Sequence, residues 1–154
     1  MSLPDVKQRP KVGIGVYILN KDNQLLLLQE KRKDGSITWA PPGGHLEFGE
    51  EFMDCVKREA KEEVNLDIID ADIWEINNTI TLPNFHYVNI DFLAKNYIGQ
   101  AKIMEPEKCL KLEWFKLNNL PSPLLAPTEK FISNNPPCLC RSGKKLNDCH
   151  GKII

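Results

Sequence analysis

The sequence lacks a long apolar run and any large excess of charge. None of its apolar stretches approaches the roughly 20 residues that a membrane-spanning helix needs, and residues 1–11 lack the apolar centre of a secretory signal. Its 20 basic and 21 acidic residues give a formal net charge of -1, which supplies no general attraction to nucleic acid or anionic lipid. We therefore expect a cytoplasmic protein with no membrane partner and no bulk nucleic-acid binding.

Cysteine is scarce and unevenly placed. The chain has five cysteines, an odd number, and three of them fall in the C-terminal tail. This distribution argues against a disulfide framework and favours a local metal site in the tail. Cys55 and Cys109 are expected to be reduced, buried small residues.

The chain is long enough for one globular domain and a short appendage. It has 154 residues, of which 42% are hydrophobic. After residue 135 two prolines precede a tail rich in cysteine, glycine and lysine, a composition that is not expected to continue the same core. The predicted units are therefore a domain over residues 1–135 and a tail over residues 136–154.

The order of secondary structure indicates an α+β sandwich. Residues 12–20 and 25–32 have strand composition around a turn and predict a hairpin, and residues 33–44 predict a loop. A helix should begin at Glu51 and end at Asn65, a plausible left-handed cap. Strands are expected over 73–82, 86–97 and 109–117, followed by a helix over 124–134 that begins near Pro127.

The first predicted helix is unusually acidic on one face. At about 100° per residue, Glu59, Glu62 and Glu63 lie within a quarter to a third of the helix circumference. Neighbouring carboxylates raise one another's pKa, and a divalent cation such as Mg²⁺ or Mn²⁺ removes that conflict. The simpler alternative is a solvated helix face. Arg58 is expected on a different side of the helix, paired with Glu50 or Glu51.

The spacing of these residues favours a metal site over a merely solvated helix face. The run fits the pattern Gly-x5-Glu-x7-Arg-Glu-x-x-Glu-Glu, with Gly44, Glu50, Arg58, Glu59, Glu62 and Glu63 in register. This pattern resembles the Nudix box of hydrolases that cleave nucleoside diphosphates linked to another group. The usual glycine after the last Glu pair is Asn65, which tolerates the same left-handed backbone.

The resemblance covers roughly residues 12–134 and implies a Nudix α/β/α sandwich with a mixed β-sheet. The segments that look most like the small nucleotide-pool phosphatases related to MutT are "PPGGHLEFGE", "FHYVNI" and "EPEKCLKLEW". The resemblance implies Mg²⁺ or Mn²⁺ ligands at Glu59, Glu62, Glu63 and the carbonyl of Gly44. It also implies that Glu50 and Arg58 brace the junction of loop and helix.

The general base is open between the box and a loop outside it. Glu62 and Glu63 are the box candidates. Glu105 and Glu107 are the outside candidates, with Glu107 also a candidate metal ligand, and a merely solvated loop is about as plausible for both.

Several side chains outside the acidic run are candidates for substrate binding. Arg32, at the end of the second strand, could clamp phosphates, or belong to an exposed basic cluster. His45 follows the glycine turn and could hydrogen-bond a base or a phosphate. Phe48, Phe85 and Tyr87 could stack on a base, although strand aromatics more often belong to the core.

The tail carries a second set of metal-ligating residues. Cys138, Cys140, Cys149 and His150 form the pattern Cys-x-Cys-x8-Cys-His, a ligand set suited to tetrahedral Zn²⁺. The pattern resembles the SEC-C motif, with Arg141 in place of the usual glycine. The alternative is a disordered tail with accidental cysteines. A zinc-folded tail would present Lys144, Lys145 and Lys152 to a protein or RNA partner.

The expected activity is Mg²⁺-dependent conversion of a nucleoside triphosphate to the monophosphate and pyrophosphate. Candidate substrates include dGTP, 8-oxo-dGTP, dCTP and dTTP, and the sequence does not choose among them. The alternatives are hydrolysis of a non-nucleotide or sugar-nucleotide diphosphate, and a non-catalytic Nudix module that binds a nucleotide or a protein. The resemblance makes a homodimer plausible.

Overall fold

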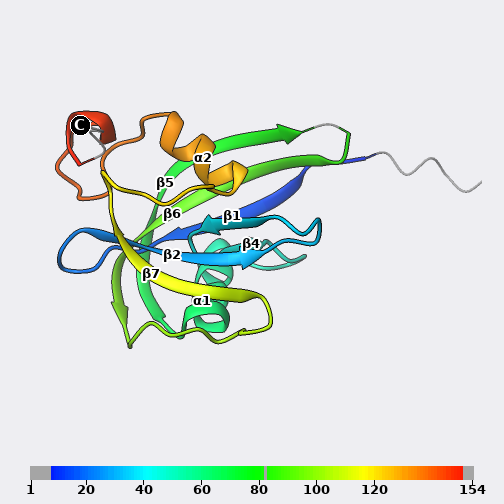
Figure 1. Cartoon of the computed structure of the whole chain (residues 1–154), viewed down its shortest axis with the longest axis horizontal. Coiled ribbons are helices and arrows are strands. Elements are labelled where there is room, and N and C mark those ends of the chain that lie inside the picture. The colour runs from blue at the N-terminus through cyan, green and yellow to red at the C-terminus, as the bar shows by residue number, and fades with distance from the viewer. Residues whose placement is uncertain (1–7, 82, 151–154) are drawn as a thin grey trace, which may run out of the picture.

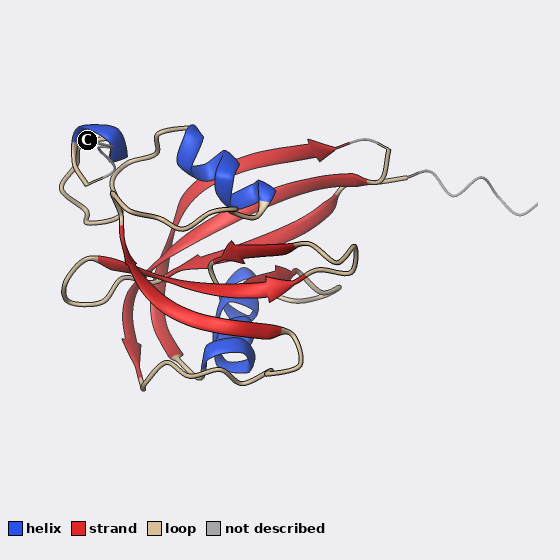
Figure 2. Ribbon diagram, in the orientation of Figure 1, coloured by secondary structure: helices blue, strands red, loops and turns tan. Residues whose placement is uncertain are grey.

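Two helices lie on opposite sides of two β-sheets in the computed structural model (Figures 1 and 2). The structure describes residues 8–81 and 83–150. Its helices and strands are β1 (Lys11–Tyr17), β2 (Gln24–Lys31), β3 (Ile37–Ala40), β4 (Gly43–His45), α1 (Phe52–Val64), β5 (Asp67–Thr81), β6 (Phe85–Ile98), β7 (Cys109–Lys116), α2 (Ala126–Ser133) and a short 3₁₀ helix, η1 (Leu146–Asp148).

The larger sheet is mixed, which confirms the expected α+β sandwich. Its strand order is β4-β1-β6-β5, with β1 parallel to β6 and the other neighbours antiparallel. The second sheet has the order β3-β2-β7 and is antiparallel throughout. Asn65 ends α1 with a φ of 63°, so the predicted left-handed cap is confirmed.

The predicted hairpin between the first two strands is wrong. β1 pairs with β4 and β6, whereas β2 pairs with β3 and β7, so the two strands belong to different sheets. The chain between β1 and β2 forms one isolated antiparallel bridge, between Leu19 and Leu25. The parallel partner of β1 lies far along the chain, and a turn signal carries no information about such a partner.

The predicted loop over residues 33–44 is also wrong, because it contains β3 and the start of β4. Both strands are short, two prolines separate them and two of the three residues of β4 are glycines, which conceals a strand pattern. β5 begins earlier than predicted, at Asp67. The predicted end of that strand, Leu82, lies outside the described residues.

β2 is buried on both faces because each sheet face is covered. Leu26 and Leu28 lie in a hydrophobic cluster with Val56 of α1. Leu25 and Leu27, which alternate with them, lie in a second cluster with Phe131 of α2. The continuous apolar run of this strand is therefore explained by two cores, one under each helix.

The tail beyond α2 is part of the second core. Cys138, Leu139 and Leu146 are buried in the same cluster as Tyr17 and Phe131. The expectation that the tail cannot share the core is therefore wrong, since three apolar side chains suffice to dock a short segment onto an existing cluster. The domain boundary near residue 135 stays a prediction based on composition.

Polar contacts also fix the tail to the outer strands of the larger sheet. The indole Nε1 of Trp74 donates to the carbonyl of Pro137 at 2.7 Å. Arg141 pairs with Asp72 at 2.7 Å, and its guanidinium lies 5.1 Å from the centre of the Trp74 ring. Arg141 has a φ of 64°, a conformation that favours glycine, and its side-chain contacts offset that cost.

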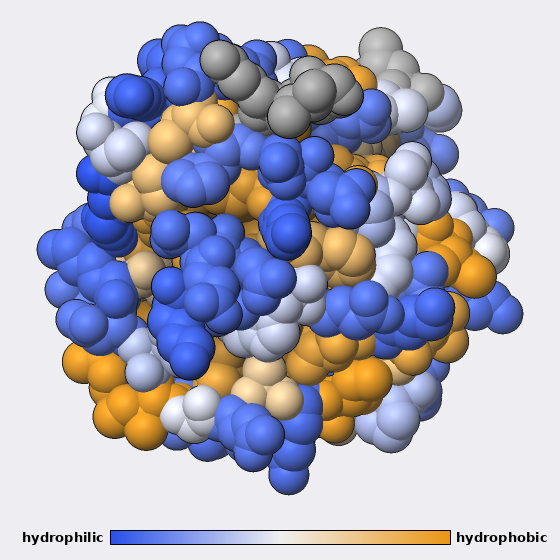
Figure 3. All heavy atoms as spheres, turned by 60° about the vertical axis from the view of Figure 1, so that its left-hand side comes forward, coloured by the Kyte–Doolittle hydropathy of each residue, from blue (hydrophilic) through white to orange (hydrophobic). Residues whose placement is uncertain are grey.

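The surface that Figure 3 brings forward is largely hydrophilic, with hydrophobic side chains exposed in several separate places. Scattered apolar groups of this kind are normal for a folded surface and do not mark a docking site. None of the helices in the described residues combines the length and apolarity needed to cross a membrane.

Truncating a tail leucine tests whether the tail belongs to the core. Leu146 is 1% exposed, so Leu146→Ala should lower the free energy of unfolding by about 2–5 kcal/mol. The control Leu110→Ala, at a residue that is 48% exposed, should change it by no more than about 0.5 kcal/mol. Chemical denaturation of both variants measures the difference, and equal stabilities would contradict the packing described above.

Candidate active site

The glycine turn and the acidic helix are in direct contact. A Cβ atom at Gly44 would overlap the carboxylate of Glu59, so only glycine allows α1 to pack this closely on β4. The backbone N–H of Gly43 donates to Glu63 Oε2 at 3.3 Å. The structure therefore brings together the two halves of the run that the sequence singled out.

Arg58 joins the helix to the loop that precedes it. Its Nε donates to Glu50 Oε1 at 2.7 Å and its Nη2 donates to Glu50 Oε2 at 3.0 Å, a bidentate pair. Nη2 also donates to the carbonyl of His45 at 3.2 Å. Hydrogen bonding to Arg58 holds the pKa of Glu50 at about 2, and the same bond raises the pKa of Arg58. This geometry supports the bracing role expected of the pair.

Arg58 also contacts the carboxylates of the helix. Its Nη1 donates to Glu59 Oε1 at 2.8 Å and lies 3.6 Å from Glu62 Oε2. The expectation that Arg58 points away from the acidic face is therefore wrong. Its long side chain spans the distance between two faces, and it places a positive charge between two of the three acids.

Burial dominates the electrostatics of the acidic face. Glu59 is buried, and burial raises its pKa even though Arg58 acts in the opposite direction. Burial, followed by the charges of Glu30 and Glu59, raises the pKa of Glu63 to about 9. Glu62 is exposed. A buried acid and a half-buried acid that resist joint ionisation form a site whose charge a divalent cation would balance.

The donor set fits Mg²⁺ or Mn²⁺, which prefer oxygen ligands from a few carboxylates. Within residues 8–81 and 83–150, one group of at least three potential metal ligands has ligand atoms that all lie within 4.8 Å of one another, and this group is in the tail and not on α1. The carboxylates of Glu59, Glu62 and Glu63 are less tightly gathered.

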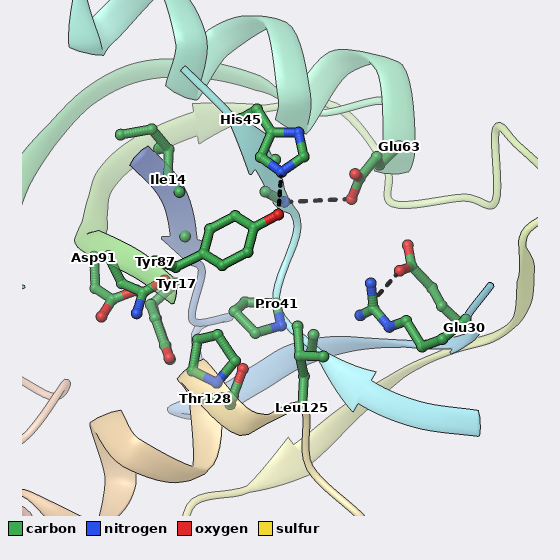
Figure 4. A pocket seen from close by; sticks show the side chains of 18 of the residues that line it. Ile14, Tyr17, Glu30, Pro41, His45, Glu63, Tyr87, Asp91, Leu125 and Thr128 are labelled. Carbon is green, nitrogen blue, oxygen red and sulfur yellow. Dashed lines mark hydrogen bonds and ion pairs between the residues drawn. The ribbon is translucent and has the colours of Figure 1, made fainter. Parts of the chain in front are cut away.

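A cavity of about 300 Å³ opens beside the acidic face. Glu30 and Glu63 line one side of it, and Tyr17 and Asp91 line the opposite side (Figure 4). Leu125 and neighbouring residues at the start of α2 close a further side. The cavity is thus polar at both ends and continuous with the carboxylates of α1.

Three of the predicted substrate-binding side chains line this cavity. Arg32 follows β2, where its Nε donates to Thr38 Oγ1 at 3.1 Å and its Nη2 lies 3.2 Å from Glu30. His45 Nε2 lies 2.7 Å from the hydroxyl of Tyr87, and the two rings stack with centroids 5.4 Å apart. Burial, helped by two lysines, lowers the pKa of His45.

The remaining candidates are divided. Phe85 lines the cavity and packs on Tyr87, with ring centroids 4.6 Å apart. Phe48 is 108% exposed and does not line the cavity, so the structure does not bring it to the site. Glu105 lies near enough to Glu63 for its charge to raise the pKa of that residue, whereas Glu107 is exposed.

Sequence reasoning missed two acids that line the cavity, Glu30 and Asp91. Glu30 lies two residues before Arg32, and side chains two apart on a strand share a face, which would have linked it to the expected phosphate clamp. Asp91 is an acid within the apolar strand β6. A charged residue inside such a strand is a signal for a buried polar site.

The four predicted zinc ligands in the tail lie together. Cys140 Sγ is 3.6 Å from Cys149 Sγ, and His150 Nδ1 is 3.5 Å from Cys138 Sγ and 3.2 Å from Cys149 Sγ. Thiolates around a tetrahedral zinc ion, with Zn–S bonds of about 2.3 Å, are separated by about 3.8 Å. The spacing and chemistry of this cluster fit a structural zinc site.

Comparison with known proteins identifies the family. A model of the NUDIX domain matches residues 9–134. The chain is 33% identical to the Nudix hydrolase YvcI of Bacillus subtilis, covering 75% of this chain and 72% of that protein. It is also 33% identical to an ADP-ribose pyrophosphatase of Methanocaldococcus jannaschii, covering 76% and 68%. A crystal structure of a MutT NUDIX hydrolase from Burkholderia pseudomallei superposes with a TM-score of 0.76 at 29% identity, covering 82% of this chain and 98% of that one. The chain therefore belongs to the Nudix hydrolase family.

Proposed function

We propose that this protein is a Mg²⁺-dependent hydrolase that converts a nucleoside triphosphate to the monophosphate and pyrophosphate. The observation that carries the proposal is the contact of two carboxylates, the buried Glu59 and the half-buried Glu63, with the glycine turn beside the cavity. This arrangement offers oxygen ligands for a metal next to a cavity that would take the phosphates of a substrate.

The residues of the chain have separate tasks in this proposal. Glu59, Glu62, Glu63 and the carbonyl of Gly44 would hold Mg²⁺ or Mn²⁺, which supplies charge neutralisation and a more acidic water. The Glu50–Arg58 pair keeps the helix against the turn. Arg32 lies in the cavity with its guanidinium available to a phosphate. The base that takes the proton from water is Glu62 or Glu63, with Glu105 as the candidate outside the box.

The wall of the cavity formed by His45, Phe85 and Tyr87 suits a flat ring. Tyr87 and His45 are stacked and held by their mutual hydrogen bond, and Phe85 packs against Tyr87. An aromatic wall fixed in this way can stack on a nucleobase without first being ordered. A nucleotide whose base stacked on this wall would extend its phosphates towards Glu63.

A second candidate substrate class is a sugar-nucleotide diphosphate. The relative from Methanocaldococcus jannaschii acts on ADP-ribose and shares a third of its aligned residues with this chain. The bond broken would again be a phosphoanhydride, so the same carboxylates would serve. A non-catalytic binding module is a weaker alternative, because every carboxylate of the box is present.

Neutralising one exposed carboxylate tests the catalytic proposal. Glu62→Gln should lower Mg²⁺-dependent turnover by on the order of 10²–10⁴-fold, the range that loss of a general base produces. The fold should survive because Glu62 is exposed. The control Glu51→Gln changes an exposed acid next to α1 and should keep normal turnover. Near-normal activity of Glu62→Gln would refute the assignment.

The products distinguish the two substrate classes. The assay should compare nucleoside triphosphates, including 8-oxo-dGTP and the common deoxynucleotides, with ADP-ribose and one isoprenoid diphosphate. Pyrophosphate release from triphosphates supports the first proposal, and AMP with ribose 5-phosphate from ADP-ribose supports the second.

We also propose that the tail binds one structural Zn²⁺ through Cys138, Cys140, Cys149 and His150. The support is the short distances among the four ligand atoms. Lys144 and Lys145 are exposed beside this cluster, and Lys152 lies outside the described residues. A protein or RNA partner for this basic surface, a homodimer and a cytoplasmic location stay predictions.

Metal analysis of cysteine variants tests the zinc proposal. The purified protein should contain one zinc per chain, and Cys149→Ser should lose most of it and melt at a lower temperature, because the tail shares the core. The control Cys109→Ser removes a buried thiol outside the tail, and its zinc content should be unchanged. A parent protein without zinc, or a Cys149→Ser variant with full zinc, would contradict the proposal.

A further inference from the structure

Asp91 is a buried acid that the proposed chemistry does not use. It is 4% exposed and lines the cavity on the side opposite Glu30 and Glu63 (Figure 4). Ile90 and Phe92, its neighbours on β6, belong to the core under α1, so Asp91 points to the other face of the sheet. It therefore lies where the end of a substrate remote from the phosphates would reach.

The two oxygens of Asp91 have different surroundings. Oδ2 accepts a hydrogen bond from Asn77 Nδ2 at 3.1 Å. Oδ1 lies against Gly15, where a Cβ atom would lie only 2.5 Å from it, so only glycine leaves room for the Asp91 carboxylate at the cavity. In the described part of the chain, no protein donor is paired with Oδ1. One oxygen is thus fixed by the protein and the other is left for a ligand.

A polar network holds Asp91 and its donor in place. Asn89 Nδ2 donates to Asn77 Oδ1 at 3.1 Å and to Thr79 Oγ1 at 3.0 Å. This orients the Asn77 amide so that its own N–H faces Asp91. A buried network whose members satisfy one another is rigid, which suits recognition of a specific group.

The environment keeps Asp91 neutral at pH 7. Burial raises its pKa to about 8, and Glu75 adds to the rise from the position directly across on β5. Tyr17 on β1 carries no charge in this range, since burial and Asp91 raise its pKa further. Lys130 and Lys145 act on Glu75 rather than on Asp91.

The position of the proton follows from the hydrogen bonds. Oδ2 accepts from Asn77 and therefore serves as the carbonyl oxygen of the neutral acid. The proton then resides on Oδ1, where it faces the cavity as a donor. A buried donor of this kind favours a ligand that offers an acceptor at the same point and disfavours one that offers a second donor.

We propose that Asp91 determines base specificity by donating from Oδ1 to a carbonyl oxygen of the substrate's ring, so that keto bases are preferred over amino bases. The inference rests on the proposed function. With the phosphates near Glu63, the group farthest from the sugar reaches Asp91, which is position 6 of a purine or position 4 of a pyrimidine. That group is a carbonyl in guanine, hypoxanthine, uracil and thymine, and an amino group in adenine and cytosine.

Matched nucleotide pairs give the test. The members of the pairs dUTP/dCTP and dITP/dATP differ at this group and at the adjacent ring nitrogen, which carries a proton only in the keto base, so the ratio of their kcat/KM values reports on recognition of this edge of the ring. At pH 7 the ratio should favour the keto nucleotide by at least about tenfold. The acid is protonated below its pKa of about 8 and ionised above it, so the ratio should fall between pH 7 and pH 9. Ionisation of groups at the metal site changes the kcat/KM values of both members of a pair by the same factor and therefore cancels from their ratio.

Two variants separate recognition from a structural role. Asp91→Asn keeps a permanent donor in place of Oδ1–H, so its ratio should remain high, and between pH 7 and pH 9 it should show only the small fall that ionisation of the keto base itself causes. Glu75→Gln removes the neighbouring charge, so the fall in the ratio should move to lower pH. The control Asp70→Asn changes an exposed acid on β5 and should leave the ratio and its pH profile as in the parent.

The outcomes distinguish this inference from the proposed function. Hydrolysis of all four nucleotides with a ratio near one, a preference for amino bases, or a ratio that does not change with pH in the parent protein would overturn the role of Asp91 alone. Absence of hydrolysis with every nucleotide would overturn the proposed function, and the inference with it. Thermal melting of Asp91→Asn checks its fold, and Glu75→Gln provides the independent readout.

Discussion

The direct contact between Gly44 and Glu59 is the constraint on which the site depends. Because no side chain separates β4 from α1, the helix packs on the turn, and its next inward-facing acid, Glu63, meets the backbone of Gly43. The Glu50–Arg58 pair holds the same junction from the other side. Glu63 is thereby held at one edge of the cavity, with Glu59 against Gly44, although burial opposes the ionisation of both acids.

The division of β1 and β2 between two sheets has a second consequence for the cavity. Apolar side chains of β1 fill the core under α1, whereas Gly13 and Gly15 lie on the opposite face and leave room there. Asn89 and Asp91 occupy that room from β6. The absence of two side chains on one strand thus accommodates a polar network on the next.

The sequence predicted the features whose cause is local. The buried Cys55 follows from its residue type and the left-handed Asn65 from the end of a helical pattern, and both were found as expected. Long-range features were missed, since β1 pairs with β6 and the tail leucines enter a core built from distant strands. The exposed Phe48 and the buried Asp91 show the same limit, because residue type alone does not reveal which side of the fold a side chain faces.

The contacts of Arg141 make the attachment of the tail depend on particular residues of the larger sheet. A glycine at this position would adopt the left-handed backbone without that cost, but the tail would then lack the contacts that Arg141 makes with Asp72 and Trp74. With arginine, the tail relies on Asp72 and on the ring of Trp74 to offset the backbone cost. Transplanted onto another domain of the same fold, the tail would lose these contacts, so its attachment depends on the particular residues that β5 presents to it.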